Sequence, residues 1–333
     1  MREFSGLSDD AVRREVLADK RPAILRGLVK DWPAVRHFLD SPGALVRYLK
    51  QHDSGSAVDA LMTAPEIDGK ISYNEAMNGF NFHRNRLPLS AVAEQVLRYA
   101  QFPKSPAVAA QSALIRDCLP AFAAENPLTL LDAGVLPRIW LGNRITTPAH
   151  VDELNNIACV VAGRRRFTLF PPEQIANLYV GPLDYAPTGA AMSLVSLRSP
   201  DLEKHPKFRA ALAASMSAEV GPGDAIFIPP LWWHHVESLE PLNVLVNYWW
   251  HDTFGEGMKS DSAFDALIHG ILSIRDLPPQ TRRAWAGFFE HYVFGAQSGV
   301  AEHIPAERRG ILADLSSAQR SALRAHLIKK LNR

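Results

Sequence analysis

The sequence predicts a mainly β core with helical additions at both ends, and three observations support this prediction. Short β-rich runs follow one another between residues 135 and 251. Gly and Pro turns separate these runs, as they do in antiparallel barrels and sandwiches. Before and after this stretch, the hydrophobic spacing is helical. We therefore divide the 333 residues into a mostly helical N-terminal region, 1–134, a core, 135–257, and a C-terminal helical region, 258–333.

The N-terminal region is expected to pack on the core. Residues 8–17 begin with the capping residue Ser8 and carry apolar side chains at helical spacing, so they predict a helix. Residues 89–99 have a second helical stripe. Residues 21–29 contain a short strand candidate that follows Pro22.

The predicted core strands are short runs rich in β-branched and aromatic residues. The third and fourth runs are separated by residues 173–218, an insertion too long for a hairpin loop, in which we expect a helix at 201–216. Long ordered insertions on a β scaffold are usually functional. The five runs are 138–142, 156–163, 165–170, 224–229 and 243–250.

Composition and charge exclude several classes of function. The 36 Lys and Arg residues balance 35 Asp and Glu, so there is no basic field for general nucleic-acid or membrane binding. No apolar run approaches the ~18 residues of a membrane span, and the N-terminus lacks a signal-peptide pattern. Two cysteines cannot build a disulfide framework. We expect a cytoplasmic protein in which Cys159 is a small buried residue.

A metal site is suggested by His150 and Asp152, which are two residues apart and so share one face of a strand. Alone, this pair is more often a strand-edge pair that is hydrogen-bonded to the backbone. A third ligand is available in His234 or His235 at the end of the fourth run, and strand parity favours His234. Two imidazoles and one carboxylate leave coordination positions open, as in non-haem Fe(II) oxygenases, so that an oxo-acid and O₂ can bind together.

Polar residues within apolar strands suggest a polar ligand. Asn156 and Asn247 lie in such strands, where an amide is costly unless it is hydrogen-bonded, either within the core or to a ligand. Among the three arginines 164–166, parity places Arg165 on the inward face with Phe167. An inward guanidinium is a bidentate partner for a carboxylate.

Five ordered motifs resemble the cupin-like JmjC oxygenases, above all their asparaginyl-hydroxylase branch. The similarity is dense from Ile139 to His251 and weaker around Trp32 and Pro33. It implies a double-stranded β-helix, or jelly-roll, core that binds Fe(II), with 2-oxoglutarate as cosubstrate and O₂. The motifs are residues 147–156, 163–172, 220–224, 228–234 and 246–249.

The resemblance also implies roles for individual residues. The three metal-site candidates would be iron ligands, two residues would bind the distal carboxylate of 2-oxoglutarate, two amides would lie near its chelating end, and a tryptophan would line the pocket wall. In that order, these residues are His150, Asp152 and His234; Thr147 and Arg165; Asn156 and Asn247; and Trp249.

The chain departs from the family pattern at three positions. A family tyrosine that contacts 2-oxoglutarate is replaced by Ala107 or Val108. A bulky aromatic residue near the triad is replaced by Ala158, which would widen the pocket. The carboxylate-binding lysine of the mammalian relative is replaced by Arg165, whose planar fork differs from a point charge.

The leading hypothesis is an Fe(II)- and 2-oxoglutarate-dependent dioxygenase that hydroxylates a C–H bond, by resemblance in a protein or peptide side chain. A small-molecule or nucleoside hydroxylase is the first alternative. A non-oxygenase cupin that holds Zn²⁺ or Mn²⁺ is the second, and a scaffold with a vestigial metal site is the third. We rank N-methyl-lysine demethylation below hydroxylation, because no zinc-binding cysteine cluster or basic tail accompanies the core.

The C-terminal helices also bear on assembly. In the asparaginyl-hydroxylase branch they make a dimer, and the aromatic stripe from Trp285 to Tyr292 permits a homodimer here.

Overall fold

The computed structural model describes residues 1–187, 189–252, 263–295 and 299–332. It divides into two compact units, Met1–Trp250 and His251–Arg333. The predicted boundary between residues 257 and 258 lies outside the described residues, and the division of the chain into three regions stays a prediction. Across the described ranges, no helix combines the length and the apolar character needed to cross a membrane.

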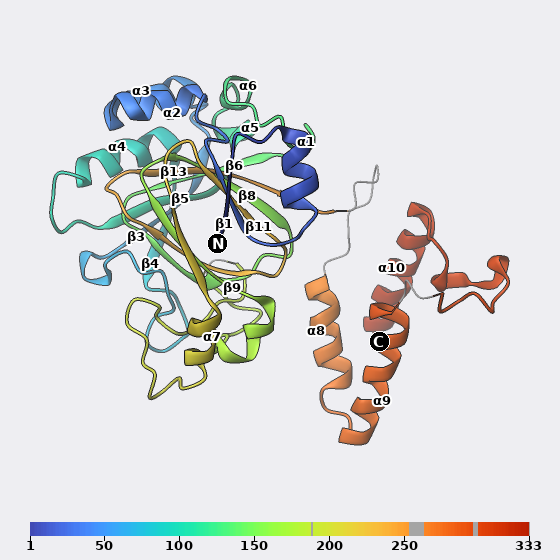
Figure 1. Cartoon of the computed structure of the whole chain (residues 1–333). Helices are drawn as coiled ribbons and strands as arrows, with labels where there is room; N and C mark the ends of the chain where they lie inside the picture. The colour runs from blue at the N-terminus through green and yellow to red at the C-terminus, as the bar shows by residue number, and fades with distance from the viewer. Residues whose placement is uncertain (188, 253–262, 296–298, 333) are drawn as a thin grey trace. The chain divides into compact units, whose positions relative to one another are not determined.

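The first unit is built on two β-sheets, as a jelly-roll core requires (Figure 1). The large sheet has the order β1 (Arg2–Ser5), β2 (Ala23–Arg26), β11 (Ala225–Ile228), β8 (Asn155–Ala162), β13 (Asn243–Trp250), β6 (Pro137–Gly142), β5 (Ala107–Leu114), β3 (Ala57–Thr63), β4 (Phe82–Pro88). The small sheet has the order β10 (Met216–Val220), β9 (Arg165–Phe170), β12 (Trp233–Ser238), β7 (Thr146–His150). The predicted mainly β fold with helical additions is confirmed.

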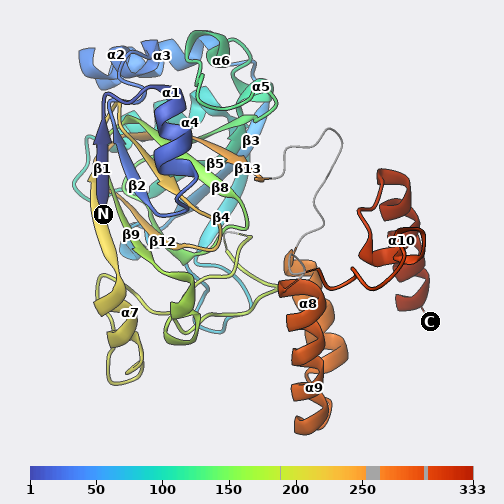
Figure 2. The same ribbon diagram turned by 45° about the vertical axis from the view of Figure 1, so that its right-hand side comes forward.

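Short helices cover the outer face of the large sheet. Ser8 caps α1, which a π-helical turn extends to Leu17, and Ser41 caps α3. Figures 1 and 2 show α2, α3 and α4 together on one side of this sheet. The helices are α1 (Asp9–Val12), α2 (Pro33–Asp40), α3 (Pro42–His52), α4 (Leu89–Tyr99), α5 (Ile115–Cys118) and α6 (Phe122–Glu125).

Two separate apolar cores explain why the central strands read as continuous hydrophobic runs. In β8, Ala158 and Val160 pack in the core between the sheets, whereas Ile157 and Cys159 pack beneath the helices. All eight residues of β8 are therefore buried. Strand β13 alternates in the same way, because Leu245 packs between the sheets and Val246 packs on the helical side. The polar residues Asn156 of β8 and Asn247 of β13 lie on the face that is directed between the sheets.

The N-terminal region contains more β-structure than its sequence predicts. The predicted helices at 8–17 and 89–99 and the strand within 21–29 are confirmed. However, five strands, β1 to β5, lie within residues 1–134 and join the large sheet. Local composition conceals them: β4 reads FHRNRLP and is largely exposed at the sheet edge, and β5 is rich in alanine. Pairing with neighbouring strands, rather than propensity, fixes these segments.

The insertion is also less helical than expected. In place of a helix over 201–216 there is α7 (Phe208–Ala214), and Met216 already begins β10, which pairs with β9. Pro206 explains the late start, because a proline disfavours the helical conformation of the residue before it. A 3₁₀ turn, Pro172–Asn177, opens the insertion. Further along, Met192 forms an isolated bridge with His150 of β7.

The second unit is helical, as predicted. It contains α8 (Ala263–Ile274), α9 (Pro279–Phe289), which a π-helical turn continues to Phe294, and α10 (Ser317–Leu331). A capping box formed by Ser316 and Gln319 begins α10. The aromatic stripe of α9 stays uncovered by the described residues: Trp285 is 44% exposed and Phe288 is 57% exposed.

Candidate metal centre and adjoining cavity

Three potential metal ligands meet at the end of the small sheet. His150 is the last residue of β7, and His234 is the second residue of β12. These two histidines are register partners on adjacent antiparallel strands. One ligand atom from each of His150, Asp152 and His234 lies within 4.8 Å of the others. Oδ2 of Asp152 lies 3.5 Å from Nε2 of His234. The structure therefore brings together the three side chains that the sequence analysis singled out.

Asp152 reaches this position by a route that differs from the prediction. Strand alternation was expected to place it on the face of His150, but β7 ends at His150 and Asp152 lies in the irregular segment that follows. Its backbone carbonyl accepts a hydrogen bond from the N–H of Leu231 at 2.8 Å. This bond holds the segment beside the start of β12.

Hydrogen bonds that the imidazoles donate to backbone carbonyl groups orient both rings. Nδ1 of His150 lies 2.9 Å from the carbonyl oxygen of Pro148, and Nδ1 of His234 lies 3.0 Å from that of Trp232. A carbonyl oxygen only accepts, so each Nδ1 carries a proton, and in the neutral form of each ring Nε2 has the free lone pair. Both rings are thus in the tautomer that presents Nε2 to a metal ion.

Burial keeps His234 neutral. Desolvation first, and then the neighbouring His150, lower the pKa of His234 to about 4. A neutral imidazole is the form that binds a metal ion. Asp152 is oriented by the indole N–H of Trp249, which donates to its Oδ2 at 3.2 Å. The donor set, its protonation and its orientation therefore fit a divalent transition metal with two nitrogen ligands and one carboxylate.

A cavity of about 160 Å³ adjoins the triad between the two sheets. All eight predicted site residues line it. The small sheet and the segment after β7 contribute Thr147, His150, Asp152, Arg165 and His234, and the large sheet contributes Asn156, Asn247 and Trp249. The cavity also includes Ala158, whose short side chain leaves space beside the triad. The structure thus gathers these residues in one place, while their functions stay a prediction.

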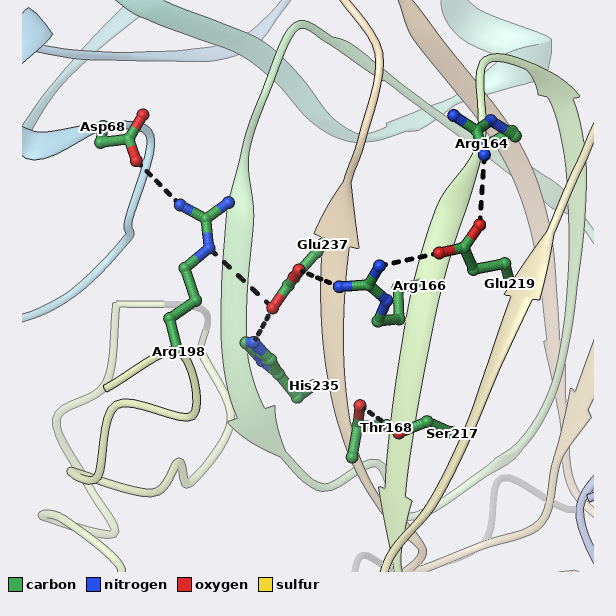
Figure 3. Close-up of polar contacts among 9 residues, drawn as sticks. All are labelled: Asp68, Arg164, Arg166, Thr168, Arg198, Ser217, Glu219, His235 and Glu237. Atoms are coloured by element: carbon green, nitrogen blue, oxygen red, sulfur yellow. Dashed lines mark hydrogen bonds and ion pairs between the residues drawn. The ribbon is translucent and has the colours of Figure 1, made fainter. Parts of the chain in front are cut away.

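Arg165 supplies the cavity with an uncompensated positive charge. Its Nε is buried without a hydrogen-bond partner, and burial lowers the pKa of its guanidinium to about 10. Across the described ranges, no carboxylate pairs with it. Its neighbours instead point away from the cavity: Arg164 and Arg166 both form ion pairs with Glu219 (Figure 3). The strand parity that favoured Arg165 as the inward arginine matches this arrangement.

His235 lies on the opposite side of β12 from the triad. Its Nε2 is 3.4 Å from Oε1 of Glu237, which in turn contacts Arg166 and Arg198 (Figure 3). Burial, followed by nearby positive charges, lowers the pKa of His235 to about 3. Only His234 of the two adjacent histidines therefore faces the cavity.

The two predicted amides belong to a chain of two hydrogen bonds, called the relay below, that runs from Trp140 through Asn247 to Asn156. The indole N–H of Trp140 donates to Oδ1 of Asn247 at 2.9 Å. The side-chain NH₂ of Asn247 then donates to Oδ1 of Asn156 at 3.2 Å. Asn247 and Asn156 are 2% and 5% exposed. They are therefore both hydrogen-bonded core amides and part of the cavity wall.

Two polar residues of the cavity, Gln111 and Ser112, were not predicted from the sequence. They lie at a bulge in β5, where the register shifts between Ala110 and Ala113 and Ser112 has a φ of 47°. A bulge breaks the alternation of faces, so inspection of the pattern could not place them. Val108, considered in place of the family tyrosine, is buried in the core under the helices, away from the cavity.

Comparison with known proteins shows which family the sequence matches. Residues 9–256 match the model of the family described as "Cupin-like domain". The chain is 26% identical over 308 residues to HSPB1-associated protein 1 of Bos taurus, covering 86% of this chain and 62% of that protein. It is 28% identical over 265 residues to Lysine-specific demethylase JMJ31 of Arabidopsis thaliana, covering 71% of this chain and 47% of that protein.

The match to a third relative includes a larger share of that protein. The human protein named Bifunctional peptidase and (3S)-lysyl hydroxylase JMJD7 is 27% identical over 266 residues, covering 71% of this chain and 79% of that protein. In contrast, the chain spans less than two thirds of the bovine and plant relatives.

Proposed function

Because the chain belongs to the cupin-like domain family, we propose that it is an Fe(II)- and 2-oxoglutarate-dependent oxygenase that hydroxylates a C–H bond. One observation carries the proposal. The three potential ligands lie at one cavity, and the same cavity holds Arg165, with which no carboxylate of the described residues forms an ion pair. A metal triad and a buried cation within one small space suit a ligand that chelates the metal and carries a second anionic group.

The residues fit Fe(II) as the metal. Nε2 of His150, Nε2 of His234 and a carboxylate oxygen of Asp152 would hold it. When bound, Fe(II) in such a site supplies the activation of O₂ that couples oxidative decarboxylation of 2-oxoglutarate, giving succinate and CO₂, to C–H oxidation. The protein residues orient the reactants and limit the access of water.

The residues also fit 2-oxoglutarate as the cosubstrate. Arg165 would bind the distal carboxylate through two parallel N–H groups, and the hydroxyl of Thr147 would donate a further hydrogen bond. Asn156 and Asn247 would lie by the end that chelates the metal. Burial of Arg165 strengthens this contact, because a carboxylate restores the interactions that the guanidinium loses on leaving water.

For the substrate, we propose a protein or peptide side chain. Two of the relatives carry names that state chemistry on lysine, one as a hydroxylase and the other as a demethylase. Hydroxylation and demethylation of an N-methyl group begin with the same C–H oxidation, so the triad is compatible with both. Hydroxylation is the reaction that we propose.

The decisive experiment measures succinate release from 2-oxoglutarate under controlled metal and O₂. We expect release to require Fe(II), 2-oxoglutarate and O₂ together, and to be abolished by His150→Ala and by His234→Ala. The matched control is His235→Gln, which changes the adjacent histidine on the other side of β12 and should retain release. Succinate release at the wild-type rate in both alanine variants would overturn the proposal. Metal binding without any effect of 2-oxoglutarate would favour a non-oxygenase cupin.

Mass spectrometry identifies the substrate class. With a peptide mixture, the protein should add one oxygen atom to a side chain in a reaction that depends on 2-oxoglutarate. Loss of a methyl group would instead indicate demethylation. Addition of oxygen to nucleosides or small metabolites, with peptides unchanged, would assign the substrate to those classes.

For assembly and location, we propose a cytoplasmic homodimer formed through the C-terminal helices. Trp285 and Phe288 are neighbours along α9, with their rings tilted by 51° and their centroids 5.4 Å apart, and they are uncovered by the described residues. Exposed aromatic clusters favour association. Phe288→Glu should convert a dimer to a monomer in light scattering. A wild-type protein that is monomeric at all concentrations would contradict the dimer.

A further inference from the structure

Trp140 and Trp249 pack edge to face in the cavity wall but donate their indole N–H groups to different partners. Their ring centroids are 6.2 Å apart with an interplanar angle of 84°. Trp249 donates to Asp152 of the metal triad, and Trp140 donates to Asn247. The two indoles therefore form a natural pair of variants, in which one ring touches the metal site and the other touches the amides.

The relay from Trp140 has one direction. An indole N–H can donate but cannot accept, so the atom of Asn247 that faces it must be the side-chain oxygen. The NH₂ group of Asn247 is then directed to the oxygen of Asn156. The oxygen of Asn156 is occupied by this bond, which leaves its NH₂ group to interact with whatever fills the cavity.

We infer that Trp140 is a positioning residue that fixes the amide of Asn156 with its NH₂ group toward the ligand and thereby selects an anion. This inference rests on the function proposed above. Without the N–H of Trp140, both amides could reverse together and keep the bond between them. Asn156 would then present its oxygen, which repels a carboxylate. With the N–H in place, Asn156, Thr147 and Arg165 all offer donors to the same cavity.

The sharpest test removes each indole N–H while keeping an aromatic ring, in Trp140→Phe and Trp249→Phe. In metal-free protein without ligand, ¹⁵N NMR follows hydrogen exchange of the side-chain NH₂ groups, with signals assigned from Asn247→Asp and Asn156→Asp. We expect Trp140→Phe to accelerate exchange at Asn247 by about tenfold, the effect of losing one buried hydrogen bond of typical strength. Trp249→Phe should leave that exchange within twofold of the wild type.

Ligand binding provides the second readout. At saturating Mn²⁺, we expect Trp140→Phe to weaken binding of 2-oxoglutarate by about 5- to 10-fold, with the affinity for Mn²⁺ unchanged. Trp249→Phe should instead weaken the binding of Mn²⁺ by about tenfold, because it removes the hydrogen bond that orients the metal ligand Asp152. In Asn247→Asp, the new carboxylate can accept a hydrogen bond from Trp140 but cannot donate one to Asn156. This substitution should therefore weaken the binding of 2-oxoglutarate more than Trp140→Phe does.

The outcomes separate the two claims. Equal exchange at Asn247 in both phenylalanine variants, or unchanged 2-oxoglutarate affinity in Trp140→Phe, would overturn the positioning role. If wild-type protein fails to bind 2-oxoglutarate, the proposed function fails, and the exchange measurement still decides whether Trp140 fixes the amides.

Discussion

His150 and His234 are register partners on neighbouring strands, and the centroids of their imidazole rings are 4.1 Å apart. This spacing makes it costly to protonate both rings, and burial adds to the cost at His234. A divalent metal ion binds both rings in their neutral form, so metal binding avoids this cost. The same arrangement makes the metal-free protein sensitive to acid.

We expect the metal-free protein to lose stability as the pH falls from about 6.5 to about 5. The folded-state pKa values of His234 and His235, about 4 and about 3, lie below the ~6.5 of an unfolded histidine. The unfolded state therefore binds more protons in this window, and each histidine removes up to about 1.4 kcal/mol of stability per pH unit. Urea denaturation across this pH range measures the slope.

The control for this prediction is His235→Gln, which removes one of the two buried histidines. Its slope should be about half that of the wild type, since each group contributes separately. A slope equal to that of the wild type would show that His235 takes up its proton as readily in the folded protein as in the unfolded chain.

Arg165→Lys should make the binding of 2-oxoglutarate dependent on pH. Burial lowers the pKa of the wild-type guanidinium to about 10, so it stays charged throughout the neutral range. The ordinary pKa of a lysine side chain is about 2 units below that of arginine. The same burial therefore brings the pKa of the lysine close to neutrality. Isothermal titration at saturating Mn²⁺ should show constant affinity for the wild type and weakening affinity for Arg165→Lys as the pH rises from about 7 to about 9. Parallel curves for the two proteins would mean that this group is not buried when the ligand binds.

Much of the site could be predicted because side chains alternate between the two faces of a regular strand. This alternation separated Arg165 from Arg164 and Arg166, and His234 from His235, without knowledge of the partner strands.

Turns can also be recognised from the sequence. Gly163, between β8 and β9, has a φ of 70°, and a Cβ at this position would lie 2.5 Å from the carbonyl oxygen of Leu242. The turn therefore requires glycine.

The remaining features depend on contacts between distant segments. Ser112 enters the cavity because a bulge shifts β5 against β6, and no local pattern marks this bulge. Asn156 lies only four residues after Asp152, yet Asn156 belongs to β8 of the large sheet and Asp152 to the irregular segment after β7, and both line the cavity. Strand β4 carries mainly polar residues and is defined by its pairing with β3. Such partners are set by tertiary structure and are invisible to periodicity.

Glu237 is the centre of a polar network on the outer face of the small sheet, and its charge should matter for stability (Figure 3). It is 8% exposed, and its carboxylate lies 3.4 Å from Arg166, 3.4 Å from His235 and 3.9 Å from Arg198. Glu237→Gln preserves the shape but removes the buried negative charge that these three donors face. We expect a loss of about 1–3 kcal/mol in the free energy of unfolding, measured by urea denaturation at neutral pH.

The matched control is Glu219→Gln, at the exposed end of the same network. Glu219 also contacts two arginines, at 2.8 and 3.2 Å, but its side chain is 41% exposed. Exposed ion pairs contribute little, so the change should be below about 1 kcal/mol. Because His235 faces away from the triad, neither variant should alter Mn²⁺ affinity. Equal losses of stability from the two substitutions would show that burial does not decide the strength of this network.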